Sequence, residues 1–149
     1  MEQDQSGLEA DRSGEADRVR LGELAERETA YGLFQRAGAM LKRRHHAQAA
    51  VLLERAAALE PHKGSIVEAL GRAYYNSGQH GRAEESFREL IEIDPSAPYG
   101  HFGLGQSLKQ LGRPDEARMH LKLAVALAPD SILYRNALAR LGGATADKS

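Results

Sequence analysis

Three prolines recur at equal intervals along the chain: Pro61, Pro95 and Pro129. Each of them directly follows a short, mostly apolar segment (AAALE, LIEID and AVALA). Because proline lacks the N–H that would continue a helix and clashes with the preceding turn, each proline is expected to end a helix. A constant period of this kind predicts a repeat architecture, in which one small unit is stacked several times.

Glycines recur inside the first helix predicted for the two later units. Leu70-Gly71 is followed, after the same interval that separates the prolines, by Leu104-Gly105. An interior glycine costs a helix about 0.5–1 kcal/mol relative to alanine, so its return predicts a close helix crossing that leaves no room for a Cβ atom. Small residues recur on the second helix and have the same interpretation: Ala49, Ala83 and Ala117.

Gly78 and Gly112 mark the turn inside the second and third units, because glycine adopts at little cost the left-handed conformation that ends a helix. The first unit has no glycine there, and residues 44–46 (Arg-His-His) stand in its place. Its first helix aligns better with the others if this turn is one residue shorter. The side chains that this shift brings into register are Phe34, Ala37, Gly38 and Leu41.

The pattern resembles the tetratricopeptide repeat (TPR), whose unit carries in order a large apolar residue, Leu-Gly, Tyr, Gly, Ala, an aromatic residue, Ala and Pro. Residues 64–97 match best, and residues 98–131 match nearly as well with His101 at the large apolar position. Residues 30–61 form a degenerate copy. The resemblance implies an all-α fold, an α-solenoid of three TPR helical hairpins plus a C-terminal closing helix, coiled as a right-handed superhelix.

The predicted organisation is a small three-repeat protein of bacterial type, because arginine outnumbers lysine fifteen to five and alanine is abundant. Residues 1–28 carry a net charge of −5 and the remainder +4. We expect this acidic segment to be largely disordered, with a helix from about residue 15. The other predicted parts are the TPR domain 29–143 (repeats of about 30–61, 64–97 and 98–131, closing helix 131–141) and a flexible tail, 144–149.

The resemblance also implies a concave groove lined by the first helix of each repeat. The groove residues implied by the register are Gln35, Arg36, Lys42, Arg43, Glu68, Arg72, Tyr75, Asn76, Tyr99, Phe102, Gln106, Lys109 and Arg140. This set is basic, with aromatic and amide side chains among the cations. Arginine suits carboxylates, so we favour an acidic peptide segment or a C-terminal carboxylate as ligand. A merely solvated charged face explains the charge excess equally well.

Two more specific ideas follow from the groove. The acidic segment 1–28 could occupy the basic groove as an autoinhibitor, although a solubilising tail is the simpler interpretation. One subclass of TPR domains grips chaperone tails with Lys and Asn in the first repeat, Asn in the second, and Lys and Arg in the third. The matching positions here are Gln35, Ala39, Ala69, Tyr99 and Gly103, so we predict that this clamp is absent.

No pattern for catalysis or for a cofactor is present. The chain has no cysteine, and its six histidines show no metal-ligand spacing. It contains no phosphate-binding loop and no Gly-x-Ser-x-Gly, and a pI near 6.6 argues against nucleic-acid binding. Neither a signal peptide nor a long apolar stretch is apparent, so a cytoplasmic location is expected.

The sequence therefore predicts a protein–protein interaction adaptor or scaffold, not an enzyme, with no cofactor and no metal. The alternative is a self-associating, oligomerisation module, which an apolar patch on the closing helix would support. The residues of that patch are Ile132, Leu133, Leu138 and Leu141. An enzyme or ligand-binding regulator has no support in the sequence, and the identity of the partner is not encoded in any pattern that we find.

Overall fold

The computed structural model describes residues 14–18 and 28–146, and all its regular elements are helices. Residues 14–18 form a short helical segment. The disorder predicted for residues 1–28 falls mostly on residues outside the described part. The stack consists of α2 (Ala30–Lys42), α3 (His46–Leu59), α4 (Gly64–Asn76), α5 (His80–Ile93), α6 (Pro98–Gln110), α7 (Pro114–Leu127) and α8 (Ile132–Ala146).

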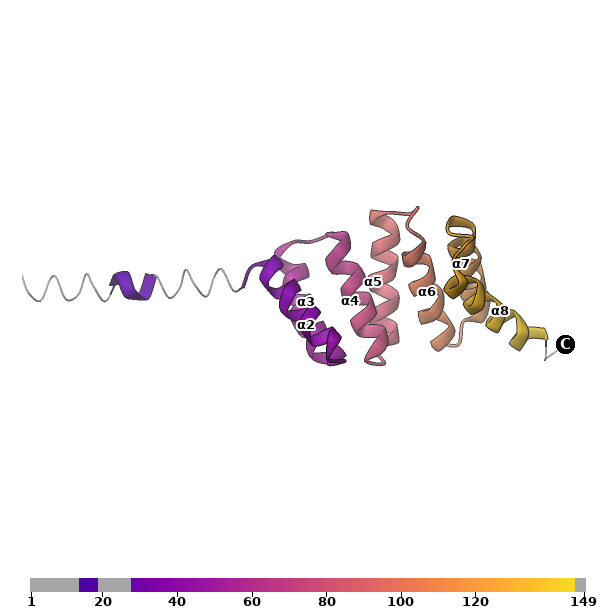
Figure 1. Cartoon of the computed structure of the whole chain (residues 1–149), viewed down its shortest axis with the longest axis horizontal. Coiled ribbons are helices and arrows are strands. Elements are labelled where there is room, and N and C mark those ends of the chain that lie inside the picture. Colours follow the sequence, from indigo (N-terminus) through magenta and orange to yellow (C-terminus); the bar gives the residue numbers. More distant parts are fainter. Residues whose placement is uncertain (1–13, 19–27, 147–149) are drawn as a thin grey trace, which may run out of the picture.

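The helices pair into three antiparallel hairpins that stand side by side, and α8 closes the row (Figure 1). Consecutive helices make the main contacts, since each packs on the one before and the one after it. Both bounds of every helix in the first two hairpins recur in the next hairpin at the interval that separates the prolines. The predicted all-α solenoid of three hairpins and a closing helix is therefore confirmed.

The turn inside the first hairpin has the same length as the other two, so the predicted one-residue shortening is wrong. His45 N donates to Met40 O at 2.9 Å, as Gln79 N donates to Tyr74 O at 2.8 Å in the second hairpin. Arg44 adopts a φ of 63° where Gly78 has 80°. Arginine thus takes the left-handed conformation that glycine takes elsewhere, because the packing of both helices fixes the turn.

Phe87 of α5 is the centre of the packing between the second and third repeats. Its side chain is 1% exposed and lies between Gly71 of α4 and Gly103 of α6. A Cβ atom built on Gly71 would lie 2.8 Å from the Phe87 ring, and one on Gly103 would lie 2.4 Å from it. The predicted close crossing at Gly71 is confirmed. Gly103 forms an additional crossing, which the repeat pattern alone does not indicate.

The third hairpin repeats this arrangement with an aliphatic side chain. A Cβ atom on Gly105 would lie 2.8 Å from Cγ of Leu121, in agreement with the predicted crossing. The recurring alanines of the second helices are fully buried, as expected: Ala49, Ala83 and Ala117. Small residues therefore set the close approach of the helices on both sides of each hairpin.

The closing helix differs from its predicted form at its C-terminal end. It runs to Ala146, beyond the predicted end at residue 141, because no proline follows and glycine weakens a helix without ending it. The predicted apolar patch is divided. Leu141 is buried and Leu138 packs against the core, whereas Ile132 and Leu133 are 65% and 59% exposed.

None of the described helices is both long enough and apolar enough to cross a membrane.

Candidate binding groove

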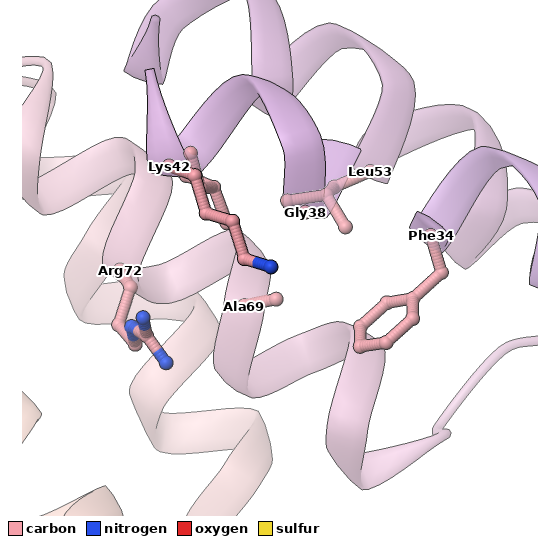
Figure 2. A pocket seen from close by; sticks show the side chains of 7 residues that line it. Phe34, Gly38, Lys42, Leu53, Ala69 and Arg72 are labelled. Carbon is pink, nitrogen blue, oxygen red and sulfur yellow. The ribbon is translucent and has the colours of Figure 1, made fainter. Parts of the chain in front are cut away.

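A first hollow lies between the first helices of repeats one and two. It has a volume of about 380 Å³ and is lined by Phe34, Gly38, Leu41, Lys42, Leu53, Ala69 and Arg72. Phe34 lies at one end of the hollow, and the charged ends of Lys42 and Arg72 lie at the other (Figure 2). Leu53 reaches the hollow from α3 and supplies part of its apolar floor. The site thus combines an apolar wall with a cationic rim.

A second hollow lies between the first helices of repeats two and three. It has a volume of about 140 Å³ and is lined by Arg72, Tyr75, Asn76, Phe87, Tyr99, Phe102, Gly103 and Gln106. Phe87 of α5 takes the position that Leu53 takes in the first hollow. Aromatic rings dominate the lining, and Arg72 belongs to both hollows.

The two hollows are repeats of one another. All the residues around the first hollow except Phe34 have their counterpart in the next repeat among the residues that line the second. The size differs because the larger side chains of the second repeat fill the same space. Gly38 corresponds to Arg72, and Leu41 corresponds to Tyr75.

Most cations on the face formed by the first helices and α8 (the first-helix face) have no ion-pair partner among the described residues, although Arg36 lies 3.9 Å from Glu28. Within the described part of the chain, no carboxylate forms an ion pair with Lys42, Arg72, Lys109 or Arg140. The arginines of the second helices do pair: Arg55 with Glu28, Arg82 with Glu54, Arg88 with Glu84, and Arg118 with Asp115. The arginines of α3, α5 and α7 are therefore paired locally, whereas these four cations of the first-helix face are not.

A row of aromatic rings continues from the second hollow to the closing helix. The ring of Tyr99 lies 5.9 Å from that of Phe102, whose ring lies 4.9 Å from that of Tyr134, centroid to centroid. Burial raises the pKa of Tyr99 to about 12, with nearby Arg72 acting against the rise and Glu68 adding to it. Burial, with a contribution from Glu68, also raises the pKa of Tyr134. Both hydroxyls are therefore neutral hydrogen-bonding groups at pH 7.

Gln106 contributes an unsatisfied polar group to the second hollow. Its Oε1 atom is buried and has no hydrogen-bond partner among the described residues. A buried amide without a partner is unfavourable by about 1–3 kcal/mol, so it marks a place where a bound chain could add a hydrogen bond.

Seven of the predicted groove residues line a hollow. They are Lys42, Arg72, Tyr75, Asn76, Tyr99, Phe102 and Gln106. Glu68 is half-buried beside Tyr99 and Tyr134, and exposed Lys109 and Arg140 extend the same face without lining a hollow.

The other three predicted residues lie on α2 or at its end, and none lines a hollow. Gln35 donates from Nε2 to the hydroxyl of Tyr31 at 2.5 Å, and Arg36 lies 3.9 Å from Glu28. Arg43 is the exposed residue that caps the helix. The wrong turn length moved the predicted positions along α2 by one residue, so Phe34 lines the hollow in place of Gln35, and Lys42 in place of Arg43. Gly38 and Leu41 line the hollow as well.

Sequence reasoning misses three further residues: Leu53, Phe87 and Tyr134. Leu53 and Phe87 occupy the family's core position on the second helix. The repeat pattern does not show that one side of each of these side chains also faces a hollow. Tyr134 of the closing helix is not among the predicted groove residues, and its contact with Phe102 could only come from the three-dimensional arrangement.

The family assignment follows from the repeat. The tetratricopeptide repeat model matches residues 34–98 and 68–132, which together span most of the described helices. The chain belongs to the tetratricopeptide-repeat family. No curated protein matches it.

Solved TPR structures share the fold at low sequence identity. The first TPR of Spaghetti (RPAP3), bound to the HSP90 peptide SRMEEVD, has a TM-score of 0.74 at 17% identity over 78% of this chain and 93% of that one. MamA from Desulfovibrio magneticus RS-1 has 0.78 at 17%, over 82% and 69%. The type III secretion chaperone SycD of Yersinia enterocolitica, in complex with a peptide of the translocator YopD, has 0.66 at 20%, over 76% and 86%. Such similarity shows the TPR fold.

The positions of the chaperone-tail clamp shift with the observed register. With the first turn at full length, the two clamp positions of the first repeat fall on Phe34 and Gly38 instead of Gln35 and Ala39. Neither is the Lys or Asn that such a clamp needs.

Proposed function

We propose that this TPR protein is an interaction adaptor or scaffold whose concave first-helix face binds an acidic segment of a partner protein. The observation that carries the proposal is the set of cations without ion-pair partners in the described part of the chain beside two apolar hollows, while the second-helix arginines are paired. Unpaired arginine next to an apolar wall favours a ligand with both carboxylates and apolar side chains. The proposal involves no catalysis.

Two structural relatives support a peptide as the class of ligand. One is bound to the HSP90 peptide SRMEEVD, and another to a peptide of the translocator YopD. The clamp positions of this chain carry Phe34, Gly38, Ala69, Tyr99 and Gly103, so a chaperone tail held by its carboxylates is not the ligand that we propose.

Affinity capture from the native cell lysate tests the adaptor function. The wild type is compared with Arg72→Glu/Lys109→Glu, and with Lys122→Glu/Arg135→Glu as a control of equal charge change at exposed positions outside both hollows. A partner retained by the wild type and the control, but lost by the folded groove variant, supports the proposal. A partner retained by all three proteins moves the binding site away from this face.

Self-association is the second candidate, and the exposed apolar side chains near the C-terminal end favour it. Met119 and Leu123 of α7 are 53% and 41% exposed, where the preceding repeat carries Glu85 and Glu89. Leu127, Ile132 and Leu133 are also exposed apolar side chains in this part of the chain. Solution mass by light scattering distinguishes the candidates: a Leu123→Glu variant should convert an oligomer into a monomer if this surface associates.

A further inference from the structure

We propose that the groove selects an extended segment in which a carboxylate lies between two apolar side chains, one for each hollow. This inference rests on the proposed function and specifies the ligand of the same site. It is carried by the repetition of the hollows, by the difference in their volumes, and by the position of Arg72 in both linings.

The repetition sets the spacing of the two apolar side chains. Packed neighbouring helices lie about 8–10 Å apart, and an extended chain advances about 3.3 Å per residue. The first helices of neighbouring repeats contact each other less than consecutive helices do, so they lie at or beyond the upper end of this distance. A chain that crosses α2, α4 and α6 therefore reaches the equivalent hollow of the next repeat after about three or four residues. The motif has its apolar side chains about three or four residues apart, with the carboxylate at an intervening position.

The volumes set which apolar side chain fits each hollow. A cavity of about 150 Å³ is known to hold a benzene ring, so the second hollow, at about 140 Å³, fits one phenyl ring or one branched aliphatic side chain. The first hollow, at about 380 Å³, has room for a larger group such as an indole. Leu53 and Phe87 give both hollows an apolar floor.

Arg72 sets the position of the acidic residue. It lines both hollows and forms no ion pair with a carboxylate in the described part of the chain, so its guanidinium can bind a carboxylate that lies between the two anchors. Lys42 adds a second cation on the side of the first hollow, whereas Asn76 occupies the equivalent position in the second. The acidic residue is therefore expected nearer to the anchor of the first hollow.

Selection from a random dodecapeptide library displayed on phage, with the full chain as bait, identifies the motif without a known partner. Enriched peptides are then synthesised with a fluorescent label, and their Kd values are measured by anisotropy. The expected consensus is a large apolar residue, an acidic residue and a phenyl or branched aliphatic residue, with the two apolar residues about three or four positions apart. Replacing any of the three with alanine should weaken binding about tenfold, because each supplies one anchor.

Gly38→Leu tests the first hollow without damage to the fold. A Cβ atom on Gly38 meets no other atom within 4 Å, and the hollow of about 380 Å³ beside it offers space for a leucine side chain, which also favours a helix over glycine. We expect at least tenfold weaker peptide binding with an unchanged or higher Tm. Gly81→Leu on α5 is the matched control, since Gly81 also has open space around its Cβ position and lines neither hollow, and it should leave the Kd unchanged.

Arg72→Gln tests the carboxylate in a double-mutant cycle. Changing Arg72 to Gln, or the acidic residue of the peptide to its amide, should each weaken binding about fivefold to tenfold. Both changes together should weaken it little further, because they remove the same contact.

The outcomes separate this inference from the proposed function. Peptides that lose affinity with Arg72→Glu/Lys109→Glu but respond neither to Gly38→Leu nor to Arg72→Gln bind the groove in another register, which overturns the inference and keeps the function. Peptides unaffected by every groove variant overturn both. A selection without any enrichment overturns the inference too, since a short extended segment would then be insufficient, and the lysate experiment decides the function independently.

Discussion

The turn of the first repeat differs from the other two turns in the residue that adopts a positive φ. Arg44 stands at a φ of 63°, where Gly78 has 80° and Gly112 has 76°. Side chains other than glycine adopt this conformation at a cost of roughly 1–2 kcal/mol, which the packing of α2 against α3 offsets. The same residue misled the prediction of the first-helix register, because an arginine in a turn position carries no sequence signal of positive φ.

Arg44→Gly should stabilise the protein. Glycine relieves the left-handed conformation but has more freedom in the unfolded chain, so we expect a net gain of about 0.5–1 kcal/mol in the free energy of unfolding. The urea midpoint measures it, provided that the slope of the transition is unchanged. Gly78→Ala should shift the stability the other way by about 1 kcal/mol. A destabilised Arg44→Gly would mean that the arginine side chain makes a stabilising contact.

His101 and His120 form a pair whose stability contribution depends on pH. Their Nδ1 atoms lie 3.2 Å apart, and His101 Nε2 lies 2.9 Å from the carbonyl of Pro95, so His101 keeps its proton on Nε2 and accepts from His120 when both are neutral. Burial lowers the pKa of His120, with the nearby His101 and Arg88 adding to the effect and Glu116 opposing it. The unfolded chain therefore binds a proton at this site more readily than the folded one.

The contribution of neutral His120 is present above its unfolded pKa of about 6.5 and decreases as pH falls through that value. We expect the wild type to lose more stability between pH 8 and pH 5.5 than His120→Gln does, as measured by urea unfolding at each pH. Equal losses in the two proteins would show that protonation of His120 is not coupled to folding.

Small residues set the helix crossings, including Gly103, which the repeat pattern alone does not indicate. Gly103→Ala should cost about 1–3 kcal/mol, because the new Cβ atom would lie 2.4 Å from the ring of Phe87, which is 1% exposed. Gly81→Ala on α5 is the control, because its Cβ atom meets no neighbour within 4 Å, and it should be neutral or stabilising. Thermal unfolding of both variants measures the difference.

If Gly103→Ala leaves the free energy of unfolding unchanged, the Phe87 ring must have given way to the new Cβ atom. The space beside the Phe87 ring on this side is the second hollow, which that ring also lines. The ring would then have moved into the hollow, and the Kd for peptides anchored there should rise.

The sequence predicts the elements better than it predicts the groove. The prolines, the paired Leu-Gly positions and the alanines fix the hairpins, since a solenoid repeats its packing residues by necessity. The hollows depend on residues that the pattern assigns to the core, such as Leu53 and Phe87, and on how far each one fills the space. Tyr134 reaches the aromatic row only because α8 packs on α7. Sequence periodicity carries no information on such contacts between side chains of different repeats.

At the scale of the whole molecule, charge is divided unevenly between the N-terminal segment and the rest of the chain. Residues 1–28 carry a charge of −5 and the rest of the chain +4. The first-helix face holds cations without ion-pair partners in the described part of the chain. If the acidic segment occupied that face, it would act as an autoinhibitor, because it would compete there with an acidic partner.

Deletion of residues 1–27 tests this competition and keeps the structured domain intact. The deletion stops before Glu28, which forms an ion pair with Arg55, and before Thr29, whose hydroxyl accepts from Gly32 N at 3.1 Å and caps α2. If the segment occupies the groove, the truncated protein should bind a groove peptide several-fold more tightly at low salt, and the difference should shrink as salt screens the charges. Anisotropy titrations at low and at high NaCl concentration measure both effects. A segment that occupied the groove would weaken binding of the peptide. Equal Kd values for the two proteins at low salt would therefore show that the segment does not occupy the groove and is a solubilising tail.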